Sequence, residues 1–217
     1  MHPKYLLRFL ARFVIAFAVL AVPWPGWPET FAAGFRGTMQ GLFNHEGSKS
    51  VVMFKPYAGG ERTLDSVILL ANRAKLDPQA RGNAASFPFS CRHVVYLPAA
   101  LCIALILASP VSVRRRAGAL IGGLIGMALF AVLLVKLMLA SLIATNTWLE
   151  LPRPGPFGQR VLAALFEVFL TYLGARFAVA VLLWIGATFR REDWERLLTL
   201  KREEKRKGPA PGAAQGK

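Results

Sequence analysis

The sequence AGALIGGLIGMALFAVLLVKLMLASLI, residues 117–143, is a long apolar run that contains a single charged residue, Lys136. About 20 apolar residues in a helix are enough to cross the roughly 30 Å of hydrocarbon in a bilayer. The run therefore predicts a membrane-spanning helix.

The rest of the chain is also too apolar for an ordinary soluble protein. Of its 217 residues, 54% are hydrophobic and only 18% are charged, and the mean hydropathy is +0.41. Further apolar runs cover residues 94–113 and 161–189, and a third covers 5–24 if Arg8 and Arg12 extend together toward the headgroups. We therefore predict a mainly α-helical membrane protein with four transmembrane helices and a small α+β periplasmic domain between the first and the second.

The predicted segments follow the chain in order. They are a signal-anchor helix at 1–25, a periplasmic α+β domain at 26–92, a helix at 93–113, a cytoplasmic arginine loop at 114–116, a helix at 117–144, a periplasmic loop at 145–160, a helix at 161–189 and a basic cytoplasmic tail at 190–217 with a disordered end. A cleaved signal peptide is the alternative for the first segment. The sequence Val-Pro-Trp-Pro at 22–25 lacks the small residues of a cleavage site, which favours a retained anchor.

The strongly basic charge follows this topology. The formal net charge is +15, which could indicate a nucleic-acid partner. However, the predicted cytoplasmic segments 1–12, 111–117 and 189–217 hold 15 of the 27 lysines and arginines, as the positive-inside rule describes. We therefore expect a bacterial inner-membrane protein with both termini in the cytoplasm, bound to anionic lipids of the inner leaflet and not to nucleic acid. The expected membrane-surface anchors are Arg114, Arg115, Arg116, Trp24, Trp27 and Trp194.

The periplasmic segment contains one helical pattern and three strand patterns. Apolar residues at three- to four-residue spacing predict an amphipathic helix over 29–43. Short β-like runs at 50–54 and 63–71 flank the turn signal Ala58-Gly59-Gly60, which predicts a hairpin. Alternation over 87–93 predicts a third strand that leads into the next helix.

Charged and glycine residues within the predicted helices are candidates for specific packing. Lys136 and Glu167 fall at similar depth, so we hypothesise that they pair; outward extension of each alone is the alternative. Arg176 is the third intramembrane charge, for which we favour a structural role or extension toward the outer surface over a ligand site. Gly118, Gly122 and Gly126 lie on one face of the predicted helix. This face permits close approach to the preceding helix or to another subunit.

The only cluster with nucleophile-like residue types is Cys91-Arg92-His93. A thiolate beside an imidazole is a way to form a nucleophile at neutral pH, and Cys91 and His93 would share a face of the predicted strand. The alternative, which we favour, is that Cys91 is a small apolar residue, His93 an interfacial residue and Arg92 a headgroup contact. We expect no disulfide between Cys91 and Cys102, no metal site and no cofactor.

The middle third of the chain resembles small accessory membrane proteins of bacterial envelopes, notably exosortase-associated ones. The similarity rests on residues 96–98 (Tyr-Leu-Pro), 108–110 (Ala-Ser-Pro), 114–116 (Arg-Arg-Arg) and 122–123 (Gly-Gly). The resemblance implies an accessory role in the envelope. Exosortases themselves take Cys, Arg and His from different helices, and here Cys91, Arg92 and His93 are contiguous, which places exosortase activity in doubt.

Three functions are compatible with these patterns. The first is a non-enzymatic component that binds a membrane-protein partner or a second copy of itself in envelope assembly, secretion or surface-polymer export. The second is a Cys-dependent, transpeptidase-like membrane enzyme that acts on a lipid-linked or lipoprotein-like substrate at the periplasmic face. The third is a small transporter, for which three isolated intramembrane charges provide a poor polar path.

Overall fold

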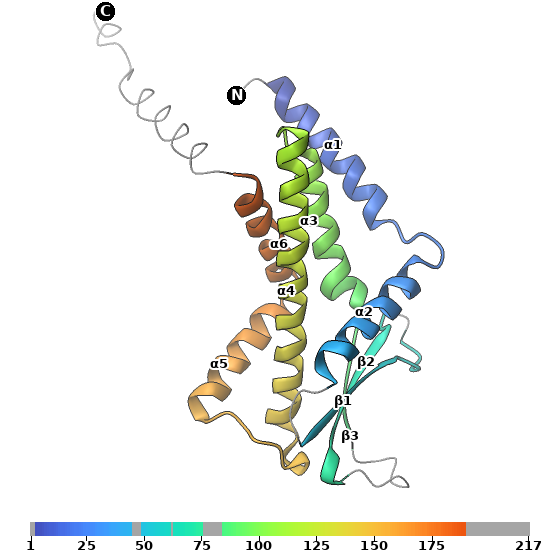
Figure 1. Cartoon of the computed structure of the whole chain (residues 1–217), viewed down its shortest axis with the longest axis vertical. Helices are drawn as coiled ribbons and strands as arrows, with labels where there is room; N and C mark the ends of the chain where they lie inside the picture. The colour runs from blue at the N-terminus through green and yellow to red at the C-terminus, as the bar shows by residue number, and fades with distance from the viewer. Residues whose placement is uncertain (1–2, 45–48, 62, 76–83, 190–217) are drawn as a thin grey trace, which may run out of the picture.

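The structure, a computed structural model, describes residues 3–44, 49–61, 63–75 and 84–189. Helices α1, α3, α4 and α6 pack side by side as an elongated bundle, and a small sheet with α2 lies at one end of it (Figure 1). The helices are α1 (Pro3–Ala21), α2 (Trp27–Phe43), α3 (Leu97–Ala108), α4 (Val113–Thr145), α5 (Pro156–Phe166) and α6 (Leu173–Thr188). Helix α1 begins, and α6 ends, at the end of the bundle far from the sheet.

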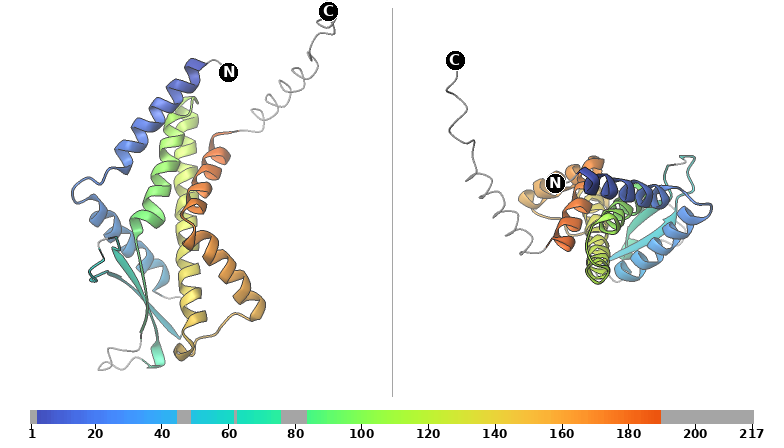
Figure 2. Two further views of the ribbon diagram at one scale, coloured as in Figure 1. Left: turned by 180° about the vertical axis from the view of Figure 1, so that it is seen from behind. Right: turned by 90° about the horizontal axis from the view of Figure 1, so that it is seen from above.

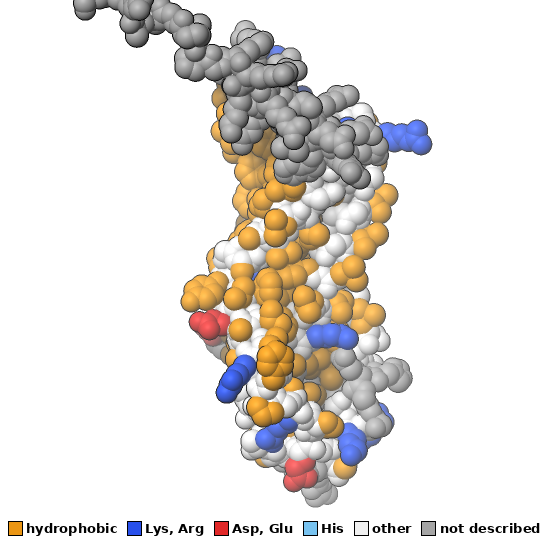
Figure 3. Space-filling model, turned by 90° about the vertical axis from the view of Figure 1, so that its left-hand side faces the viewer, with side chains coloured by type: hydrophobic (Ala, Val, Ile, Leu, Met, Phe, Trp, Pro, Cys, Tyr) orange, Lys and Arg blue, Asp and Glu red, His pale blue; other side chains and the backbone are white. Residues whose placement is uncertain are grey.

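Helix α4 is the longest element, with 33 residues and a length of about 50 Å at 1.5 Å per residue. One side of it packs against α3, α6 and the sheet, and its side chains there are buried, among them Met127, Leu134 and Met138. The other side exposes large apolar side chains, such as Ile121 and Leu129. Hydrophobic side chains cover much of the middle of the molecule, seen from one side in Figure 3. An exposed apolar surface of this extent is typical of a protein that contacts lipid or a protein partner.

The prediction of four transmembrane helices is wrong. By length and composition, α4 is the only one of the described helices that is able to cross a membrane alone. If α5 and α6 together count as one broken span, the described residues contain two candidate spans. Helix α1 carries three basic residues within 19, and α3 with the turn before it covers only residues 92–108. The segment predicted at 161–189 is divided into two helices that meet at a bend of 86°. Helix α5 begins away from the bundle and runs toward it, and α6 then continues along the bundle (Figure 2).

The sheet has three antiparallel strands in the order β1 (Ser50–Pro56), β2 (Ser66–Asn72) and β3 (Ala84–Phe89). The predicted hairpin is confirmed, since Val52 pairs with Leu70 and Phe54 with Ile68. The predicted amphipathic helix corresponds to α2, which lies along β1. The side-chain amide of Gln40 accepts from the amide of Phe54 and donates to the carbonyl of Val52, so α2 covers this edge of the sheet.

The third strand begins and ends earlier in the chain than the predicted range 87–93. It ends at Phe89, and residues Arg92–Tyr96 form a π-helical turn that continues directly into α3. Cys91 has helical backbone angles (φ −55°, ψ −36°). The alternation over 87–93 is therefore partly coincidental, because residues 91–93 already belong to a helix.

Candidate functional site

Asp65, which lies just before β2, organises the junction between the sheet and α3. Its Oδ1 accepts from the amide of Cys91 at 3.0 Å, and its Oδ2 accepts from the amide of Arg92 at 3.4 Å. The Ser90 hydroxyl donates to Oδ2 at 3.5 Å. The first amides of a helix have no partner within it, so the carboxylate of Asp65 caps the helical segment that begins at Cys91.

The thiol of Cys91 points away from solvent. Its side chain is 0% exposed, and its Sγ lies 3.2 Å from the hydroxyl of Ser66. Burial raises the pKa of Cys91 to about 12, with a further contribution from the negative charge of Asp65. The residue is therefore a neutral, inaccessible thiol at physiological pH. Both Cys91 and Cys102 are free thiols.

His93 and Arg92 lie at the surface of the same turn. The Nδ1 of His93 lies 3.0 Å from the hydroxyl of Ser90. Nη2 of Arg92 donates to the carbonyl of Ala21, and the hydroxyl of Tyr96 donates to the carbonyl of Leu20. These two bonds satisfy carbonyls at the end of α1, so the turn joins the sheet, α1 and α3 at one place.

A pocket with a volume of about 450 Å³ and several charged side chains in its wall opens beside this turn. Its walls come from α2, the segment before β2 and the turn at residues 90–93. The side chains that line it are Pro28, Glu29, Ala32, Arg36, Pro56, Thr63, Leu64, Asp65, Ser90, Arg92 and His93. Cys91 is not among them, so the structure brings Arg92 and His93 to a pocket but separates both from the thiol.

Arg176 is buried, with 6% of its surface exposed. Its Nη1 donates to the carbonyl of His93 at 3.3 Å, and its Nη2 donates to the carbonyl of Leu170 at 3.4 Å. Both carbonyls belong to π-helical turns, Arg92–Tyr96 and Glu167–Thr171. Arg176 therefore bridges the irregular turns at which α3 begins and the α5–α6 pair bends.

The other two predicted intramembrane charges lie in different surroundings. Lys136 is on the part of α4 that faces the sheet, where it lines a pocket with Ser50, Val52 and Leu70. Glu167 is exposed at the start of the turn after α5. The pairing of Lys136 with Glu167 stays a hypothesis.

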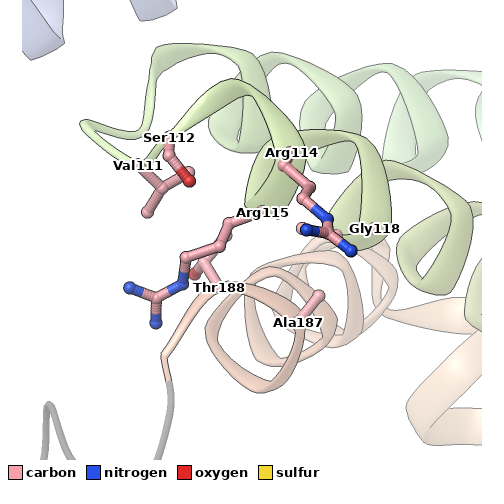
Figure 4. Close-up of a pocket in the computed structure, with 8 residues that line it drawn as sticks. Val111, Ser112, Arg114, Arg115, Gly118, Ala187 and Thr188 are labelled. Atoms are coloured by element: carbon pink, nitrogen blue, oxygen red, sulfur yellow. The ribbon is translucent and has the colours of Figure 1, made fainter.

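The three consecutive arginines have separate environments at the start of α4. Figure 4 shows Arg114 and Arg115 extending toward the last turn of α6, where Ala187 and Thr188 lie; these residues line a pocket of about 510 Å³. The Arg116 side chain instead turns back, and its Nη2 donates to the carbonyls of Ser109 and Val111. Arg116 thus closes the connection between α3 and α4.

The glycine face of α4 is divided between open surface and close packing. A Cβ at Gly118 or Gly122 would meet nothing within 4 Å, whereas one at Gly126 would lie 2.8 Å from Leu183 of α6. One at Gly123 would lie 2.8 Å from Ile106 of α3. Close helix approach within the chain therefore uses Gly123 and Gly126.

Among the predicted aromatic anchors, Trp24 lies between α1 and α2 and Trp27 is the first residue of α2. Both side chains are exposed. Trp194 lies outside the described residues.

Sequence reasoning missed Arg36, Asp65, Ser66 and Ser90, although these residues shape the site. Nη1 of Arg36 donates to the carbonyl of Asp65 and to the hydroxyl of Ser66. An acidic residue beside a turn has no local pattern that indicates a cap 26 residues away. Within the described residues, no three His, Cys, Asp or Glu side chains are grouped to hold a metal ion.

Comparison with protein-family models, curated proteins and solved structures found no match to this chain.

Proposed function

We propose that this chain is a non-enzymatic accessory protein of a bacterial inner membrane, which binds a protein partner or a second copy of itself in envelope assembly, secretion or surface-polymer export. The observation that carries the proposal is the burial of Cys91. Its thiol is 0% exposed and paired with Ser66, so the nucleophile required by the Cys-dependent enzyme hypothesis has neither access to a substrate nor a thiolate at neutral pH.

The proposed membrane placement rests on α4. Between the arginines at 114–116 and Lys136, residues 117–135 carry no charge, and this length corresponds to about 28 Å of helix, close to the thickness of the hydrocarbon. The large exposed apolar side chains of this helix lie within the same range, apart from Val113 at its start: Ile121, Leu124, Ile125, Leu129 and Leu133. We place the arginine end of α4 in the cytoplasm and the sheet on the periplasmic side.

In this placement, Lys136 marks the outer boundary of the hydrocarbon and does not lie within it. The side chain is near the polar Ser50 of β1. The last ten residues of α4 then project beyond the membrane and support the sheet. The side-chain amide of Asn72 in β2 donates to the carbonyl of Leu149 at 2.8 Å, which fastens the sheet to the segment after α4.

Purification from native membranes in a mild detergent, followed by mass spectrometry of whatever elutes with the chain, tests the proposal. We expect a stoichiometric protein partner or a defined homo-oligomer, retained equally by a Cys91→Ala variant. A monomer that carries a lipid-linked substrate in the native chain, with altered turnover in Cys91→Ala, would support the enzyme instead.

A further inference from the structure

The pocket beside the turn at residues 90–93 contains more hydrogen-bond donors than the described residues use as partners. A guanidinium has five N–H groups. Arg36 uses only Nη1, for Asp65 and Ser66, and Arg92 uses only Nη2, for Ala21. Both side chains are half-buried in the pocket wall, so their remaining N–H groups have no acceptor among the described residues.

Two carboxylates of described residues line the pocket, and they differ in the number of hydrogen bonds that they accept within the protein. Asp65 accepts from two main-chain amides and from Ser90, so its oxygens are occupied within the protein. Glu29 lies in the first turn of α2 and is exposed. No hydrogen bond or ion pair of Glu29 occurs within the described part of the chain. Its carboxylate is therefore available to a ligand that carries a positive charge.

We propose that this pocket binds a phosphate ester that carries an ammonium group, the chemistry of phosphoethanolamine. The guanidinium groups of Arg36 and Arg92 bind the phosphate, since their planar N–H pairs match its oxygens. Glu29 binds the ammonium group. Among the described residues that line the pocket, two arginines balance two carboxylates with His93 neutral, which favours a zwitterion over a simple anion.

The position of the pocket is suited to a lipid headgroup. Pro28 and Glu29 in its wall follow Trp27, whose indole is exposed, and Trp24 is exposed nearby along the chain. Tryptophan side chains are typical of the boundary between hydrocarbon and water. The volume of about 450 Å³ is in the range of small-ligand sites. The same chemistry is present in a soluble headgroup, and the experiment separates the two sources.

Isothermal titration calorimetry of the full chain in an uncharged, phosphate-free detergent tests the chemistry. The probes are glycerophosphoethanolamine and glycerophosphoglycerol, two phosphodiesters of which only the first carries an ammonium group. We expect about tenfold tighter binding of the first, as one charge-assisted interaction provides. Glu29→Gln, an exposed position whose change does not disturb packing, removes this preference. Arg92→Gln weakens both probes by about tenfold, and Arg153→Gln, an exposed arginine on the loop before α5, changes neither.

Native mass spectrometry of the chain after exchange into mixed phosphatidylethanolamine and phosphatidylglycerol distinguishes the sources. Selective retention of phosphatidylethanolamine, lost in Glu29→Gln, identifies a lipid headgroup; binding of glycerophosphoethanolamine without lipid retention identifies a soluble ligand. Equal binding of both phosphodiesters by the native chain would overturn the proposal. It would also be overturned if no probe or lipid binds, or if folded Arg92→Gln and Glu29→Gln variants bind as the native chain does.

Discussion

Replacement of Arg176 by methionine tests how the two irregular turns are held together. Methionine preserves most of the apolar stem of the side chain but removes both donors, which leaves the carbonyls of His93 and Leu170 without this partner. Both contacts are partly buried, and an unsatisfied carbonyl costs up to about 1–3 kcal/mol. Part of this loss is offset because a guanidinium no longer has to be buried, and its Nε has no partner among the described residues. We expect a net loss of about 2–4 kcal/mol in the free energy of unfolding.

The assay is denaturant titration in detergent micelles followed by tryptophan fluorescence. Trp184 on α6 is a suitable reporter, because its Nε1 donates to the hydroxyl of Ser109 at the end of α3. Arg176→Lys keeps the charge but does not reach both carbonyls as a fork does, so we expect an intermediate loss. Arg160→Met, at an exposed position of α5, is the matched control and should change stability by less than about 0.5 kcal/mol. If Arg176→Met unfolds at the same denaturant concentration as Arg160→Met, the bridge contributes nothing and the reasoning is refuted.

Four further outcomes are expected. Gly123→Val should lower stability by about 1–3 kcal/mol through overpacking against Ile106, whereas Gly122→Val, at an open position, should not; thermal melting in detergent compares them, and equal losses would exclude the packing argument. Cys91 should resist iodoacetamide at pH 8 in the folded chain, whereas Ser86→Cys, at an exposed position of β3, should react; rapid alkylation of Cys91 would contradict its burial. The pKa of Cys91 is raised from 9.0 to about 12 in the folded state, so the thiol of the unfolded chain loses its proton at lower pH than the thiol of the folded chain. Cys91 should therefore lower the free energy of unfolding by up to about 1.4 kcal/mol per pH unit between pH 9 and 12 and have no effect below pH 9. A Cys91→Ala variant with the same pH dependence of stability would contradict this. Asp65→Ala should lower stability by about 1–2 kcal/mol and speed hydrogen exchange at the amides of Cys91 and Arg92, because it removes their acceptor; unchanged exchange would show that Asp65 is not the cap.

The elements with strong local patterns were predictable from the sequence. The apolar run at 117–143 corresponds to α4, and the hairpin and the amphipathic helix have the pairing and position that their periodicity indicates. In each of these elements, the apolar positions that form the local pattern are the positions that form the packed or apolar face of the element in the fold. Local periodicity was therefore sufficient for them.

The number of spanning helices was not predictable from apolar runs alone. The run at 161–189 gives no sign that the chain bends by 86° near Tyr172, because the bend is held by Arg176 through contacts with a distant turn. The candidate site also depends on a long-range contact, because Asp65 accepts a hydrogen bond from the amide of Cys91, which lies 26 residues later in the chain. Contacts between segments far apart in the sequence decide both features, and a single sequence contains no direct record of them.

The crossing of the membrane by α4 is the central claim, and cysteine accessibility at its two ends tests it most directly. In a Cys91→Ala, Cys102→Ala background, Ser112→Cys and Thr147→Cys place one thiol at an exposed position just beyond each end of the helix. A membrane-impermeant maleimide applied to intact bacterial cells with a permeabilised outer membrane should label Thr147→Cys and reach Ser112→Cys only after lysis. Labelling of both positions from the same side would contradict the account.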